Sequence, residues 1–230
     1  MINLVSLNIA LPEKINLNGG SKKLLTGFFK RPVDERIFLG ESGFHGDGVG
    51  DSRIHGGQDL AVCAYFVDHF DYWQAELDKE MKPGAFGENL SLSGINEKQI
   101  YIGDIFRLDE AEIEVSQPRQ PCHKLNKVFD LQEMACKVQK TGYTGCYFRV
   151  KKTGWVEPDS VLEIINSVIK VTGAKPKIVD GKRRVGDPER LVSDTKKIRS
   201  ALGWEPDYTK IDDIIQTAWN WYKLNNMCKI

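Results

Sequence analysis

Long hydrophobic runs are missing from this sequence of 230 residues. No stretch approaches the roughly 20 apolar residues that a membrane helix needs, and the beginning, MINLVSLNIALPE, lacks the basic and apolar regions of a secretory signal. Neither sign of charge is in excess, since the chain has 32 Lys and Arg against 32 Asp and Glu. No overall field therefore favours a nucleic acid polymer or an anionic membrane. We expect a cytoplasmic protein with neither as a partner.

Cysteine is scarce and has no diagnostic spacing. The five residues are an odd number and form no CxxC pair or zinc-binding spacing, so neither a disulfide framework nor a structural metal site is indicated. Reduced thiols are expected at Cys63, Cys122, Cys136, Cys146 and Cys228.

Up to about residue 166 the sequence consists of short apolar runs separated by glycine and other turn residues. Runs rich in Val, Ile, Phe and Tyr are typical of strands in a barrel or sandwich. Helical spacing of apolar residues predicts two inserted helices, within 67–80 and 130–142. We expect a mostly β domain with inserted helices (α+β) over residues 1–166, with strands in the runs INLVSLNIA, RIFLG, LAVCAYF, QIYIGDIFRL, EIEVSQ, YFRVKKTGWV and VLEII.

Residues 167–230 differ in character and are expected to form a second, mainly helical part. They hold 13 Lys and Arg against 8 Asp and Glu, an excess of five that residues 1–166 balance. One helix is predicted from Asp194 as its cap to Gly203, and an amphipathic helix within 210–226. The apolar face of the second comprises Ile214, Ile215, Ala218 and Trp219.

The segment SQPRQPCHKL, residues 116–125, places one cysteine beside basic residues and between prolines. Nearby cations favour the thiolate form, which is the nucleophilic and metal-ligating form of cysteine. Pro118 and Pro121 are expected to keep the segment out of regular structure and on a stiff loop. The alternative is that Cys122 is a small buried residue, as most free cysteines are.

Three glycine-containing segments carry further candidates, each with a structural alternative. HGG at 55–57 permits close approach of a ligand to the backbone, or is a hairpin turn. Glu88 and Asn89 form a tight polar loop with their glycines, or cap a helix or loop. The GD pair at 103–104 enters a strand, or forms a β-turn.

Together, five segments resemble a MOSC domain, the domain named for the C-terminal region of molybdenum cofactor sulfurase, and in particular the bacterial YiiM-like proteins. The resemblance covers roughly residues 1–165, and the QPRxPCxKL stretch is specific to it. It implies a MOSC-type β-barrel, here followed by a small helical appendage. The segments are HGG at 55–57, AFGENL at 85–90, YIGDIFRL at 101–108, VSQPRQPCHKL at 115–125 and KTGYTGCYFRV at 140–150.

The resemblance implies that the chain binds the molybdenum cofactor (molybdopterin) and reduces N-hydroxylated compounds such as hydroxylaminopurines, with electrons from a separate donor protein. Cys122 would ligate molybdenum, since thiolate is a soft donor. His123 or His55 would relay a proton, although a loop histidine is more often a hydrogen-bonding residue. The expected cofactor-binding residues are His55, Gly56, Gly57, Glu88, Asn89, Arg119 and Lys124.

Unlike residues 1–165, residues 168 to about 226 resemble the C-terminal end of a UDP-glucose 4-epimerase. The resemblance would place Arg184 and Asp187 beside a nucleotide-sugar. Because the chain lacks a GxGxxG strand–helix unit and a helical YxxxK, no epimerase activity is expected. The tail is then a structural appendage or a fusion scar, and its aromatic residues would suit a homodimer contact.

Two alternatives to a reductase stay open. The chain could carry the cofactor or a sulfur group on Cys122 without turnover. It could instead bind a nucleotide-sugar through its tail, which predicts stabilisation by UDP that is lost in Arg184→Ala.

Overall fold

The computed structural model describes residues 2–16, 24–164 and 211–226. The chain divides into two compact units, Met1–Ile164 and Ile165–Ile230. Within the described ranges, no helix has the length and apolar character required to cross a membrane. The candidates Asp194, Gly203, Arg184 and Asp187 lie outside the described residues.

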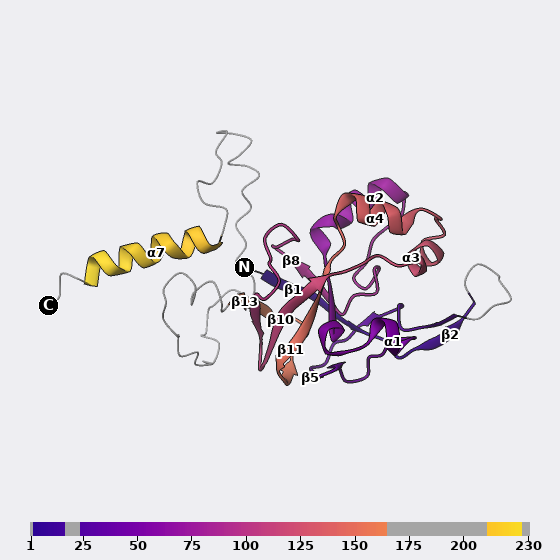
Figure 1. Cartoon of the computed structure of the whole chain (residues 1–230), viewed down its shortest axis with the longest axis horizontal. Helices are drawn as coiled ribbons and strands as arrows, with labels where there is room; N and C mark the ends of the chain where they lie inside the picture. Colours follow the sequence, from indigo (N-terminus) through magenta and orange to yellow (C-terminus); the bar gives the residue numbers. More distant parts are fainter. Residues whose placement is uncertain (1, 17–23, 165–210, 227–230) are drawn as a thin grey trace. The chain divides into compact units, whose positions relative to one another are not determined.

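The first unit is built around a closed barrel of seven strands (Figure 1). Neighbouring strands follow the order β13-β9-β10-β11-β7-β8-β1, and β13 pairs with β1 to close the ring. All these pairings are antiparallel except the parallel pair β7 and β8. The strands are β1 (Ile2–Ile9), β7 (Val62–Phe66), β8 (Leu90–Ser93), β9 (Ile105–Leu108), β10 (Ala111–Pro118), β11 (Cys146–Lys152) and β13 (Val161–Ile164).

Short strands and helices surround the barrel. The strand β4 (Arg31–Pro32) extends the sheet beside β1. One small sheet consists of β12 (Gly154–Val156), β5 (Ile37–Gly40) and β6 (Gly43–Phe44). Another consists of β2 (Glu13–Ile15) and β3 (Leu24–Thr26). The helices are α1 (Ser52–His55), α2 (Phe70–Leu77), α3 (His123–Val128) and α4 (Met134–Thr141), with short 3-10 turns η1 (Gln58–Leu60) and η2 (Val67–His69). Figure 1 shows α2, α3 and α4 gathered on one side of the barrel.

Two apolar clusters hold this unit together. The larger fills the barrel with inward-facing residues such as Leu7, Phe106 and Phe148, which are almost completely buried. The smaller lies among the helices and is centred on Trp73 and Phe86. Alternate residues of a strand face opposite sides, so Tyr65 of β7 packs in the second cluster with residues of α2 and α4, while Ala64 and Phe66 face the barrel interior.

The predicted helices within 67–80 and 130–142 are confirmed as α2 and α4. Phe70 and Trp73 of α2 are buried, as are Met134 and Val138 of α4. The predicted glycine stop of the second helix is also confirmed, because Gly142 adopts a left-handed conformation with φ of 74° and donates its N–H to Gln139 O.

Each predicted run contains a strand, but the structure differs from the prediction in several places. The run 99–108 contains a strand only over Ile105–Leu108, because residues 101–104 form a turn in which the Asp104 carboxylate accepts the Tyr101 N–H at 2.8 Å. The strands β2, β3, β4, β6 and β8 lie outside the predicted runs, and the run 147–156 is divided between β11 and β12. Pro118 does not interrupt regular structure, as it ends β10, and α3 begins at His123, so only 119–122 form the irregular loop expected for the whole segment.

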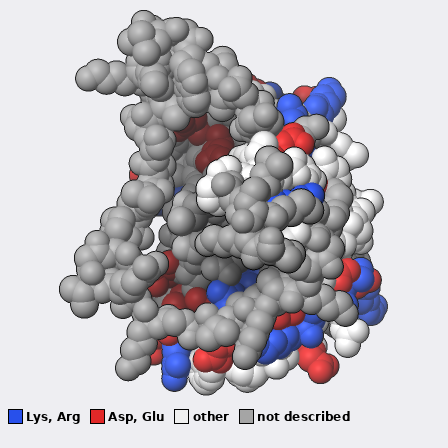
Figure 2. All heavy atoms as spheres, turned by 90° about the vertical axis from the view of Figure 1, so that its left-hand side faces the viewer, with Lys and Arg blue, Asp and Glu red and all other residues white. Residues whose placement is uncertain are grey.

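In the second unit the structure describes one helix, α7 (Ile211–Asn226). It confirms the helix predicted within 210–226, but of the predicted apolar face only Ile215 and Trp219 are half-buried, while Ile214 and Ala218 are exposed. On the face drawn in Figure 2, described Lys and Arg residues lie interspersed with Asp and Glu.

Candidate functional site

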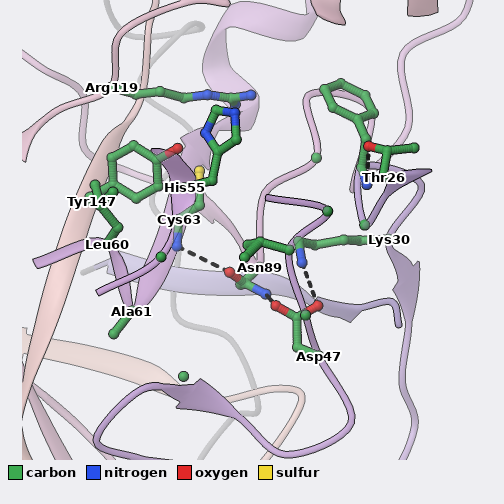
Figure 3. Close-up of a pocket in the computed structure, with 18 of the residues that line it drawn as sticks. Thr26, Lys30, Asp47, His55, Leu60, Ala61, Cys63, Asn89, Arg119 and Tyr147 are labelled. Carbon is green, nitrogen blue, oxygen red and sulfur yellow. Dashed lines mark hydrogen bonds and ion pairs between the residues drawn. The ribbon is translucent and has the colours of Figure 1, made fainter. Parts of the chain in front are cut away.

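A cavity of about 160 Å³ lies where β7, β11 and several loops meet. Its wall combines backbone of glycine-rich loops with a small set of polar side chains, several of which are drawn in Figure 3. Of the nine site residues predicted from the sequence, seven line this one cavity: His55, Gly56, Gly57, Asn89, Arg119, Cys122 and Lys124.

The loop 119–122 brings the predicted thiol and its cations to the cavity. Arg119 follows the last residue of β10 and is half-buried, with its N–H donating to Gly145 O at 3.0 Å. Cys122 caps the N-terminus of α3 and is partly exposed, and Lys124 lies one residue inside the helix. The cavity therefore holds an accessible thiol together with two basic side chains.

The HGG segment ends the short helix α1 and exposes backbone to the cavity. Gly56 donates its N–H to Ser52 O at 3.1 Å, so it completes the helical turn. Gly57 has φ of 105°, and a Cβ built there would meet no atom within 4 Å. Only glycine adopts that φ readily, and the space beside it leaves the backbone open to a ligand. HGG is therefore not a hairpin turn.

His55 lies against the cations of the cavity. Burial lowers the pKa of its imidazole, and Lys124 and Arg119 lower it further by charge repulsion. Figure 3 shows the imidazole beside the Arg119 guanidinium. The neutral form of His55 is therefore favoured, and this form can accept a proton.

Cys63 and Tyr147 form a second part of the wall. They are opposite residues on β7 and β11, and both line the cavity. Cys63 is 7% exposed, and burial raises the pKa of its thiol. Burial, followed by the charge of Cys63, raises the pKa of the Tyr147 hydroxyl. Both groups are therefore neutral at physiological pH, although the cationic Arg119 lies near them (Figure 3).

A polar network underlies the other side of the cavity (Figure 3). Asn89 accepts the Cys63 N–H at 3.1 Å and donates from its amide to Asp47 Oδ2 at 2.8 Å and to Asn8 O at 3.2 Å. Asp47 in turn forms an ion pair with Lys30, and their side chains are 11% and 6% exposed. The pair is largely removed from water, so each charge depends on the other.

Two predicted site residues do not line the cavity. Glu88 is fully buried, and its carboxylate accepts the N–H groups of Gly84 and Phe86 at 2.7 and 3.0 Å and the Ser91 hydroxyl at 2.7 Å. It closes the loop before β8, as the capping alternative anticipated. His123 is exposed at the start of α3.

No sequence motif pointed to four residues that the structure adds to the site: Lys30, Asp47, Cys63 and Tyr147. Lys30 and Asp47 lie in loops distant in sequence from the specific segment. Cys63 lies in a continuous apolar run, which indicates a core residue. Tyr147 lies in the quoted segment 140–150, but its side-chain direction depends on strand register.

A family model described as the MOSC domain matches residues 51–163. The YflK protein of Bacillus subtilis (strain 168) is 47% identical over 164 residues, covering 71% of this chain and 73% of its own. A protein named reductase from Gibberella moniliformis (strain M3125 / FGSC 7600) is 37% identical, over 57% of this chain but only 24% of its own.

The crystal structure of YiiM from Geobacillus stearothermophilus superposes with a TM-score of 0.59 and 33% identity, covering 72% of this chain and 75% of that one. A UDP-glucose 4-epimerase of Lacticaseibacillus casei shares 55% identity over 29 residues, which is 13% of this chain and 9% of the epimerase. That match is a short partial one. The barrel, the specific cysteine segment and these relatives together show that the chain belongs to the MOSC family, among its YiiM-like members.

Proposed function

We propose that this chain is a molybdenum-cofactor oxidoreductase that reduces N-hydroxylated compounds such as hydroxylaminopurines, with electrons from a separate donor protein. The observation that carries the proposal is the placement of an accessible thiol, Cys122, in one cavity with Arg119 and Lys124. The family membership and the name of the fungal reductase support the same reaction class.

The residues of the cavity fit such a cofactor. A thiolate is a soft ligand suited to molybdenum, and Arg119 and Lys124 are suited to a phosphate. The open backbone at Gly57 permits the close approach that a bulky pterin requires. When bound, the cofactor supplies the two-electron chemistry, while the protein supplies position, charge and protons.

Each side chain has a distinct part in this proposal. Cys122 holds the metal, and Arg119 and Lys124 counter the negative charge of the cofactor phosphate. His55 is better placed than His123 to handle a proton, because it lines the cavity and its neutral form is favoured. Glu88 and Asn89 contribute indirectly, since their side chains form hydrogen bonds that hold the loops and strands around the cavity in place.

A carrier that holds the cofactor or a sulfur group on Cys122 is the second candidate function. The partial exposure of Cys122 favours it, because a carried group must be released to another protein. The two functions differ in turnover. Only the reductase oxidises a reduced electron donor when hydroxylaminopurine is added.

The deciding experiment is molybdenum content by elemental mass spectrometry, after expression in a host that makes the cofactor. Wild type is compared with Cys122→Ala and with Cys136→Ala, which removes an exposed cysteine away from the cavity. We expect near-stoichiometric molybdenum in wild type and Cys136→Ala and little in Cys122→Ala. A folded wild type that contains no molybdenum would contradict the proposal.

A further inference from the structure

A group of polar residues, of which His69 is buried and Glu97 and Tyr143 are half-buried, contacts the edge of the site without lining the cavity. His69, at the end of η2, contacts Glu97 between Nε2 and Oε2 at 2.7 Å, and their side chains are 9% and 20% exposed. The ring of Tyr143 stacks on the His69 imidazole with 3.8 Å between centroids and 9° between planes. Glu97 is therefore held in one orientation by a packed and hydrogen-bonded partner.

The second oxygen of Glu97 connects this group to the cavity. Glu97 Oε1 accepts the Gly145 N–H at 2.8 Å, and the Gly145 carbonyl accepts the Arg119 N–H at 3.0 Å. Arg119 begins the loop that leads to Cys122, and both residues line the cavity. A chain of short contacts thus runs from His69 through Glu97 and Gly145 to the backbone of Arg119.

Gly145 transmits position because it has little freedom to move. It has φ of 72°, and a Cβ built there would lie 2.2 Å from Ala64 O, in the backbone of β7. Its N–H and its carbonyl belong to adjacent peptide units, and their relative orientation is set by its own dihedral angles. Fixing the N–H with Glu97 therefore also restricts the carbonyl that Arg119 uses.

We propose that Glu97, oriented by His69, is a positioning residue of the site: it fixes Gly145, and through it the backbone from which Arg119 and Cys122 reach the cavity. Glu97 itself does not line the cavity. The role of Glu97 in holding the anionic cofactor rests on the proposed function. The contacts from Glu97 to Arg119 do not.

The first test measures hydrogen exchange of the Arg119 amide by NMR in the cofactor-free chain. Glu97→Ala removes the acceptor of Gly145, and we expect the Arg119 amide to exchange about fivefold to tenfold faster, the loss that one hydrogen bond would cause. Glu97→Gln keeps an oxygen for the Gly145 N–H and a polar group beside His69, so exchange of the Arg119 amide should stay near the wild-type rate.

Glu110→Ala is the matched control. Glu110 also accepts a backbone N–H, that of Trp155 at 3.2 Å, but neither residue lines the cavity. Glu110→Ala should leave the hydrogen-exchange rate of the Arg119 amide unchanged. Unchanged exchange in Glu97→Ala, or an equal increase in Glu110→Ala, would overturn the inference.

The second test measures molybdenum and pterin retained per purified chain. We expect about fivefold less of both in Glu97→Ala and near wild-type amounts in Glu97→Gln and Glu110→Ala. In an Arg119→Lys background, the further loss caused by Glu97→Ala should be smaller, because the Arg119 guanidinium, one of the two groups that Glu97 positions, has already been replaced.

Equal losses in both backgrounds would show a general structural effect and overturn the inference. If wild type holds no molybdenum, the proposed function fails, and the Arg119 exchange alone decides whether Glu97 positions the site.

Discussion

Cys63 and Tyr147 face each other across β7 and β11, and their side chains share one wall of the candidate cavity. Cys63 differs from Cys122 in burial although both line the same space. The two thiols of one cavity thus differ in exposure to reagents, so they should differ in reactivity.

Alkylation should distinguish these thiols. With iodoacetamide at mildly alkaline pH, we expect Cys122 and the exposed Cys136 to react much faster than Cys63 and Cys146, because burial raises the pKa of both latter thiols and blocks access. Peptide mass spectrometry over time would measure each rate. In denaturant the four rates should converge, and a Cys63 rate equal to that of Cys136 in the native protein would contradict the described burial.

Gly145→Ala should destabilise the fold by at least about 2 kcal/mol, since it combines an unfavourable positive φ with a collision against Ala64 O. Gly142→Ala is the matched control, with φ of 74° and no atom within 4 Å of the added Cβ. It should cost only about 1 kcal/mol. Urea denaturation of the two variants measures the difference. Equal free energies of unfolding would mean that the close approach to β7 is absent.

Breaking the Lys30–Asp47 pair should be costly. Lys30→Met or Asp47→Asn alone leaves a nearly buried charge unpaired, which typically costs about 3–5 kcal/mol. The double variant leaves no such charge, so its loss of stability should be smaller than the sum of the single losses. A denaturation cycle of all four proteins tests this. Additive losses would indicate that the two side chains do not depend on each other.

Acidification should weaken the fold through His55. Because burial and nearby cations lower its pKa in the folded state below the ordinary value of 6.5, the unfolded chain binds the proton more readily. Stability contributed by neutral His55 is present above pH 6.5 and is lost as the pH falls toward the folded-state pKa. His55→Gln should therefore lose less unfolding free energy than wild type between pH 7.5 and 5.5. An identical pH dependence in the two proteins would argue against this environment.

Local patterns predicted the elements whose apolar spacing is regular, such as α2, α4, β1 and β10. They failed for β8, where Leu90 follows a polar loop directly and the strand is short. The segment around Cys122 predicted one side of the site. The opposite side required strand register and loop packing: nothing local indicates that Cys63 faces a cavity, or that Lys30 meets Asp47. The assignment of 167–230 as a separate domain, and the ligand roles of the nine residues, stay predictions.

Closure of the barrel has a consequence for the order of events during folding. The closing pair joins the first and last strands of the unit, with Ile2 opposite Leu162 and Asn3 opposite Val161. During synthesis, the edge of β1 that pairs with β13 stays unpaired until almost the whole unit has left the ribosome. Contacts so distant in sequence slow folding and leave an open strand edge exposed to other chains. Binding of a chaperone to the nascent chain should therefore be strongest before β13 emerges.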